Sequence, residues 1–193
     1  MLEGKLHETE TVGEINLGIY EIPLESIVGT LTEARSTAFA GNFMPLLAEG
    51  SEFASKWQSL YSHHIRDGIS DPIKVYEYLN RFYVVEGNKR VSVLTHVGAY
   101  SIRAEVIRIL PKRDTKNRDI SIYYEIVDYN PHILAFVGMW FGRRGSFTKL
   151  MENARKFSET VPELKGKQPH VWLSKVFRDF SRQYRAAGFG DIN

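Results

Sequence analysis

The chain contains no cysteine among its 193 residues. Disulfide bonds, thiol nucleophiles and thiolate metal sites are therefore excluded. The sequence also lacks any apolar run near the roughly 20 residues that a membrane-spanning helix needs. Its first residues, MLEGKLHETET, are polar and acidic and do not resemble a signal peptide. We therefore expect a cytoplasmic protein with no membrane partner.

What the sequence does contain is typical of a folded protein with a real core, since 43% of residues are hydrophobic and 12% aromatic. The net charge is only +2, but it is unevenly placed. Residues 1–140 hold 14 Lys and Arg against 18 Asp and Glu, whereas residues 141–187 hold 11 against 4. This excess indicates either an anionic partner for the C-terminal part or a solvated helical surface.

Periodicity and turn residues predict an α/β (α+β) fold, a small mixed β-sheet with packed helices. Residues 15–128 would form this domain, and residues 129–193 a helical C-terminal extension. Residues 1–14 are expected to be loose. Strands are expected at residues 15–22, 73–78, 82–85, 102–109 and 120–127, and helices at 51–67, 88–97, 170–187 and from Ser146 onward.

The segment YVVEGNKRVSVL, residues 83–94, is the main candidate for a functional site. A strand that runs through Gly87 directly into a helix leaves backbone N–H groups at the helix start, where the helix dipole also favours anions. Lys89 and Arg90 add positive charge there, and Arg can hold a phosphate through two parallel hydrogen bonds. Glu86 is placed to accept a ribose hydroxyl, to hold a metal or to act as a base. An ordinary exposed turn with solvated cations would have the same sequence.

Three blocks around this turn resemble the ParB/sulfiredoxin superfamily, of the ParB-like nuclease domain type. They are IPLESI at residues 22–27, DPIKV at 71–75 and YVVEGNKR at 83–90, followed by Gly98 and a strand at 102–109. The resemblance covers about residues 15–110. It implies a ParB/sulfiredoxin-like fold in which Gly87, Asn88, Lys89 and Arg90 bind the phosphates of a nucleotide. ParB-like proteins often keep an Arg near the ligand at the place of Arg35, which is therefore either a second phosphate contact or simply a surface residue.

Departures from the family pattern exclude its two best-known activities. Sulfiredoxin-like enzymes need a catalytic Cys in the turn, where this chain has Asn88. ParB proteins carry a longer arginine-rich turn. In this chain Asn88 and Lys89 replace the first two side chains of that turn, and Ser92 replaces its last Arg. The downstream motif that helps ParB to bind CTP has no counterpart. Nucleotide binding, with ATP or CTP and an accompanying Mg²⁺ ion, remains open.

The turn also resembles that of small-molecule kinases of the same fold, which have an acidic residue before the glycine. Glu86 stands at that position. A phosphotransferase or nucleotide hydrolase using Glu86 and Mg²⁺ is therefore an alternative, with Glu25 or Glu33 as the second carboxylate. A closer resemblance, to uncharacterised bacterial ParB-like regions, rests on residues 42–47 and on WF at 140–141 with GSF at 145–147. It implies a regulatory or binding module, and leaves open whether the chain is part of a longer protein.

A basic stripe on the last predicted helix is the third candidate. Lys175, Arg178, Arg182 and Arg185 fall on one face, opposite Trp172, Val176 and Phe180, which we expect to be buried. Such a stripe suits DNA phosphates or simply solvent. No His, Asp and Glu spacing favours a metal held by protein alone. The leading prediction is a nucleotide- or phosphate-binding module in a DNA-associated or regulatory role; the alternatives are the enzyme above and a DNA-binding protein, and a homo-oligomer is open.

Overall fold

The computed structural model covers residues 1–193 and describes all of them except residues 8, 33–37, 47–49, 135–140 and 190–193. Within α6, the side chains of residues 178, 181 and 185 are also outside the description. The chain divides into two compact units, Met1–Lys112 and Arg113–Asn193. Each unit is considered by itself below.

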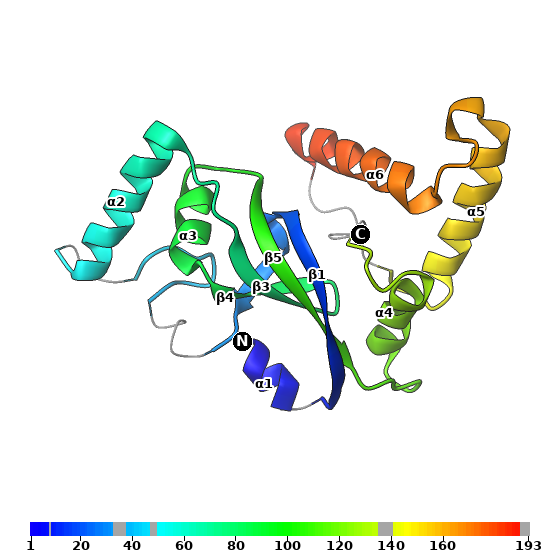
Figure 1. Ribbon diagram of the computed structural model, residues 1–193, viewed down its shortest axis with the longest axis horizontal. Coiled ribbons are helices and arrows are strands. Elements are labelled where there is room, and N and C mark those ends of the chain that lie inside the picture. The colour runs from blue at the N-terminus through cyan, green and yellow to red at the C-terminus, as the bar shows by residue number, and fades with distance from the viewer. Residues whose placement is uncertain (8, 33–37, 47–49, 135–140, 190–193) are drawn as a thin grey trace. The chain divides into compact units, whose positions relative to one another are not determined.

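The N-terminal unit is built on a five-stranded mixed sheet with strand order β1-β5-β3-β4-β2 (Figure 1). The central pair β5–β3 and the outer pair β4–β2 are parallel, whereas β1–β5 and β3–β4 are antiparallel. The predicted mixed sheet with packed helices is thus confirmed. The strands are β1 (Thr11–Pro23), β2 (Ile27–Thr30), β3 (Ile73–Tyr78), β4 (Arg81–Glu86) and β5 (Ser101–Pro111).

A two-residue turn, Leu79-Asn80, joins β3 to β4. Both residues have positive φ, 52° and 60°, as a type I′ hairpin turn requires, although neither is glycine. The carboxylate of Glu77 supports this turn because its Oε1 accepts a hydrogen bond from the Asn80 N–H at 2.6 Å. The backbone strain at Leu79 is therefore offset by a side-chain acceptor of β3.

The same carboxylate forms a buried ion pair across the parallel β3–β5 ladder. Glu77 lies opposite Arg108 in register, and Arg108 Nε donates to Glu77 Oε2 at 2.5 Å. Both side chains are completely shielded from solvent. Because charges buried in a protein interior are costly unless paired, this pair constrains how β3 and β5 align.

Helices cover the sheet in the N-terminal unit. Helix α1 (Leu2–His7) was expected to be a loose segment, but Leu2 is fully buried in a cluster with Tyr78, Tyr83 and Ile109. Helix α3 (Asn88–His96) buries Val91, Val93 and Leu94, and α2 (Glu52–Asp67) lies on its outer side (Figure 1). The short 3-10 helix η1 (Leu24–Ser26) links β1 to β2.

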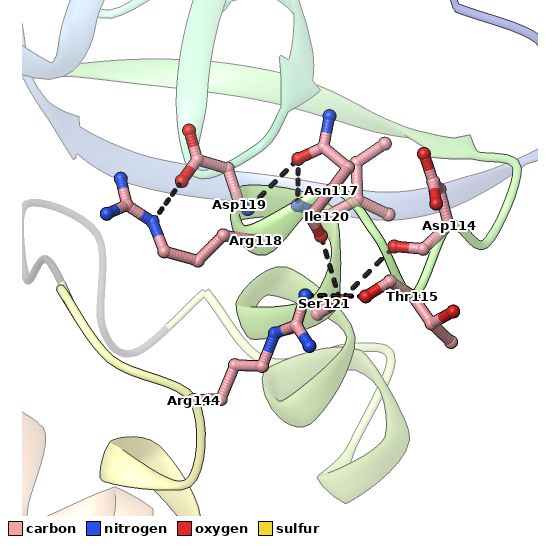
Figure 2. Close-up of polar contacts among 8 residues, drawn as sticks. All are labelled: Asp114, Thr115, Asn117, Arg118, Asp119, Ile120, Ser121 and Arg144. Atoms are coloured by element: carbon pink, nitrogen blue, oxygen red, sulfur yellow. Dashed lines mark hydrogen bonds and ion pairs between the residues drawn. The ribbon is translucent and has the colours of Figure 1, made fainter.

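Residues predicted as the fifth strand, 120–127, are instead part of helix α4 (Arg118–Tyr129), so that prediction was wrong. Figure 2 shows the reason at its start: Asn117 Oδ1 accepts hydrogen bonds from the N–H groups of Asp119 and Ile120. This is a standard N-terminal cap, and it selects the helix. The Ser121 hydroxyl then donates to the Asn117 carbonyl, and Arg144 donates to the Thr115 carbonyl.

The C-terminal unit consists of α4, α5 (Ser146–Thr160), the 3-10 helix η3 (Pro162–Leu164) and α6 (Pro169–Ala186). Its core contains Ile126, Ile133, Phe147 and Met151. Because Ile126 belongs to α4, the helical part begins earlier than the predicted boundary at residue 129. An ion pair with two hydrogen bonds from Arg113 lowers the pKa of Asp128 and fastens the start of the unit to α4.

Helix α5 starts at Ser146 as predicted, but no side chain of its own first residues caps it. Gly145 is the capping position, with φ 78°, and its own side chain offers no acceptor. Instead Glu125 of α4 supplies the carboxylate: Oε1 accepts from the Gly145 N–H at 2.5 Å and Oε2 from the Thr148 N–H at 3.4 Å. An acidic group is favourable at this end of a helix.

Replacement of Arg108 by Met should destabilise the protein by about 3–5 kcal/mol, because it leaves the Glu77 carboxylate buried without its partner. Urea unfolding followed by circular dichroism measures this loss. The double variant Glu77→Leu, Arg108→Met should lose less than the sum of the two single variants. Lys56→Ala, which removes an exposed ion pair with Glu52, is the control and should leave the urea midpoint unchanged. An unchanged midpoint in Arg108→Met would contradict the role of the pair.

Candidate functional site

The turn between β4 and α3 is formed as the sequence predicts. Strand β4 ends at Glu86, Gly87 takes a left-handed conformation with φ 106°, and α3 begins at Asn88. A Cβ atom on residue 87 would lie 2.4 Å from Cγ2 and 2.9 Å from Cβ of Ile73 on β3. Glycine is therefore required twice, by its backbone angle and by the close approach of β3.

The first turn of α3 is the chemically important part of the site. The first hydrogen bond of the helix runs from the Val91 N–H to the Gly87 carbonyl, at 3.1 Å. The N–H groups of the residues before Val91 point out of the helix end, as in any helix, and have no partner within it. Together with the helix dipole they favour an anion at this point.

Arg90 stabilises the turn through hydrogen bonds to the main chain just before β3. Its Nη1 donates to the main-chain carbonyls of Asp71 and Pro72, at 3.0 and 2.8 Å, and the side chain is only 20% exposed. Its Nη2 lies 4.0 Å from Glu86 Oε1, which is the limit of an ion pair. The guanidinium therefore ties the start of α3 to the entry of β3. This role of Arg90 was not predicted from the sequence.

Asn88 and Lys89 occupy different surroundings. Asn88 is 7% exposed, and among the described residues its buried Oδ1 has no hydrogen-bond partner. Lys89 Nζ lies 4.9 Å from the centre of the Phe53 ring on α2, a cation–π distance. The hydrogen bond and charge of Lys56 lower the pKa of Glu52, and the charge of Lys89 adds to this effect. Lys89 thus faces the start of α2.

Glu86 is at the end of β4 with an exposed side chain. Its nearest cation is Lys74 on the neighbouring strand, with Lys74 Nζ 3.8 Å from Glu86 Oε2. Since both side chains are exposed, this pair is weak and either group can turn toward a ligand. The two proposed partner carboxylates are placed only in part: Glu25 belongs to η1, and Glu33 lies outside the described residues.

Ser92, which stands where ParB proteins carry an Arg, has a structural role. It is fully buried, and its hydroxyl accepts a hydrogen bond from Trp57 Nε1 at 2.9 Å. Trp57 stacks on Tyr61, and both rings meet His96 edge-on. These contacts fix α2 on α3. The sequence alone did not identify Ser92 as the partner of Trp57.

The remaining predicted residues are not brought together with the turn by any described contact. Arg35 lies outside the described residues. On α6, Lys175 and Arg182 are exposed, and Arg182 is paired with Asp179 at 3.4 Å; the side chains of Arg178 and Arg185 are outside the description. The expected burial of Val176 and Phe180 is wrong, because Leu173 and Ser174 face the core instead.

Within the described residues, no three His, Asp or Glu side chains are grouped so that they could hold a metal ion. No helix of the described chain is long and apolar enough to cross a membrane.

Replacing Gly87 by Ala should destabilise the protein by more than about 2 kcal/mol, because strain at positive φ is added to the overlap with Ile73. Gly98→Ala is the matched control, since Gly98 also has positive φ, 72°, but a Cβ there would meet nothing within 4 Å. It should lose only about 1 kcal/mol. Both values come from urea unfolding. Equal losses in the two variants would show that Ile73 does not restrict residue 87.

Comparisons with known proteins gave no match to any protein-family model and none to the curated proteins. Solved structures that are similar to this chain include three with a TM-score of 0.33 each. Sulfiredoxin from Arabidopsis thaliana is 24% identical, over 46% of this chain and 82% of that one. A Pnob8-like ParB-N domain is 10% identical, over 80% of this chain and 52% of that one.

The third is the C-terminally truncated chromosome-partitioning protein ParB from Caulobacter crescentus, complexed with CTP-gamma-S. It is 16% identical, over 89% of this chain and 86% of that one. The similarity of these three structures to this chain is low. At these identities and TM-scores it assigns no ligand and no activity to this chain.

Proposed function

We propose that this chain is a binding module for a phosphate-bearing ligand, a nucleotide in the first instance, held at the turn from Glu86 to Arg90. The observation that carries the proposal is the start of α3. Gly87 opens the helix directly after a strand, Lys89 belongs to the first turn of that helix, and Lys74 lies 3.8 Å from Glu86 at the end of the strand. We assign the module a regulatory or DNA-associated role.

Each residue of the turn has a distinct part in this proposal. Main-chain N–H groups of the first helical turn donate to phosphate oxygens, as at other helix N-termini. Lys89 moves from the Phe53 ring to the phosphate, since a cation–π contact at a partly exposed site is worth only about 0.5–1 kcal/mol. Arg90 keeps the turn in shape through its carbonyl acceptors. Gly87 allows the close approach of the backbone.

Asn88 adds a polar group that the fold itself does not satisfy. Its Oδ1 is buried and unpartnered among the described residues, a state that costs about 1–3 kcal/mol. A hydroxyl or amino group of the ligand would satisfy this oxygen. With the amide turned over, its Nδ2 would donate to a phosphate instead. A ligand that offers both phosphate and sugar hydroxyls, as a nucleotide does, fits this set of groups.

A Mg²⁺ ion would arrive with the nucleotide, since Mg²⁺ is usually bound through phosphates and one or two carboxylates. Glu86 is the carboxylate nearest in sequence to the turn and would take a place in its water shell. The same position supports the alternative of a phosphotransferase or nucleotide hydrolase, in which Glu86 assists catalysis. The exposed Lys175 and Arg182 of α6 support the other alternative, contact with DNA through the C-terminal helices.

Calorimetric titration with ATP, CTP and their diphosphates, each with Mg²⁺, tests the proposal. Lys89→Ala should weaken binding about tenfold, because one charge-assisted hydrogen bond to phosphate is lost. Lys156→Ala is the control: it removes an exposed cation of α5 and should leave the affinity unchanged. Absence of binding by the wild type, or equal effects of the two variants, would overturn the proposed site.

Glu86→Gln separates binding from catalysis. For a binding module, the variant should bind the nucleotide without Mg²⁺ at least as tightly as the wild type, because a negative charge near the phosphates is removed. No phosphate should be released by either protein in a malachite green assay with Mg²⁺. Release by the wild type that is lost in Glu86→Gln would replace the binding module with the enzyme alternative.

A further inference from the structure

The outer edge of β1 is a long, exposed strand edge. Strand β1 spans 13 residues and stands at the end of the strand order, so in the described chain it pairs only with β5. Most of its residues are exposed, including the apolar side chains of Val12, at 61%, and Ile19, at 55%. Typical strands have about five or six residues, so this edge offers backbone groups over an unusual length.

Few of the usual devices protect this edge. Exposed edges are commonly blocked by lysine, by proline, by bulges or by shortness of the strand. Strand β2, at the other end of the sheet, has only four residues. In β1 there is no lysine, and its proline, Pro23, is the last residue. The ladder with β5 is irregular between Thr11 and Gly13 and between Asn16 and Gly18, and it is uninterrupted over residues 13–16 and 18–23.

The charged side chains of β1 itself, Glu14 and Glu21, are both acidic. Between residues 6 and 34 the sequence has six Glu and no Lys, Arg or Asp. Within the strand, Glu14 is exposed, while the Glu21 carboxylate accepts from the Ser101 hydroxyl. Glu10, just before the strand, is paired with Lys112. Two copies of this chain that paired through β1 would set acidic strands side by side, which is unfavourable.

We propose that β1 is a docking edge for an extended basic segment of a partner protein, which adds to the sheet as a sixth strand. Main-chain hydrogen bonds along β1 would supply the affinity, as in other cases of strand addition. Lys or Arg side chains of the partner would lie opposite Glu14, and apolar side chains beside Val12 and Ile19, because cross-strand neighbours of these kinds stabilise a sheet. This inference is independent of the nucleotide site.

The test uses the full chain and a ten-residue synthetic peptide of alternating lysine and valine, labelled for fluorescence anisotropy. We expect saturable binding that persists at 150 mM salt, and no binding of the matched peptide of glutamate and valine. The double variant Glu14→Lys, Ile19→Lys should weaken binding at least tenfold, since both side chains are exposed and the fold is retained. Glu159→Lys, an exposed charge reversal on α5, is the matched control and should bind as the wild type.

Hydrogen exchange identifies the place and the mode of binding. Strand addition predicts that the peptide protects main-chain N–H groups at alternate residues of β1, those directed away from β5. Lack of binding, or binding without protection in β1, would overturn the proposal. Sedimentation of the chain alone provides the remaining outcome: a dimer that Ile19→Lys dissociates would assign the edge to a second copy and would also overturn it.

Discussion

The buried pair of Glu77 and Arg108 is the constraint on which the N-terminal unit depends. Two opposite charges without access to water must keep their partners, because either one alone in that place is strongly unfavourable. The pair joins neighbouring parallel strands whose residues are 31 positions apart in sequence. It therefore sets the alignment of β3 and β5, and through the second oxygen of Glu77 it also supports the turn into β4.

The alignment of β3 with β5 also determines the shape of the turn between β4 and α3. Once β3 is fixed, Ile73 lies directly under residue 87, and the carbonyls of Asp71 and Pro72 are available to Arg90. The site is thus held by contacts with a strand that precedes it in sequence by about 15 residues, rather than by its own neighbours. For this reason the guanidinium of Arg90 is used to hold the turn against the residues before β3. Lys89, which is held only by a ring contact, is left as the more adaptable cation.

Local patterns predicted the elements around the site well. The bounds of β3 were obtained from the sequence, and α2, β4 and α3 were predicted to within a residue or two, because a cap at Ser51, a glycine at each helix end and alternating apolar residues all agree. Strand β2 was missed, since four residues that pair in parallel with a strand some 50 positions later leave no local signal. Residues 118–129 fit both periods, and the Asn117 cap was overlooked.

The parts of the site that could not be predicted are those decided by tertiary contacts. Sequence shows that Arg103 and Arg108 lie on opposite faces of β5, but not which face is buried. It shows Arg90 three residues after Gly87, but not that the guanidinium donates hydrogen bonds to the carbonyls of Asp71 and Pro72. The glycine that follows β4 and opens α3 predicted the location of the turn. The roles of the single side chains depend on distances that only the assembled sheet defines.

The carboxylate of Glu125 at the start of α5 has a consequence for how the C-terminal unit forms. Helix α5 receives its terminal acceptor from α4 across 20 positions of sequence, and not from its own first residues. An isolated peptide with the sequence of α5 would begin without this acceptor and would fray. We therefore expect the two helices to gain their order in one concerted step, so that folding of this part of the chain has no stage in which α5 stands complete while α4 is still a coil.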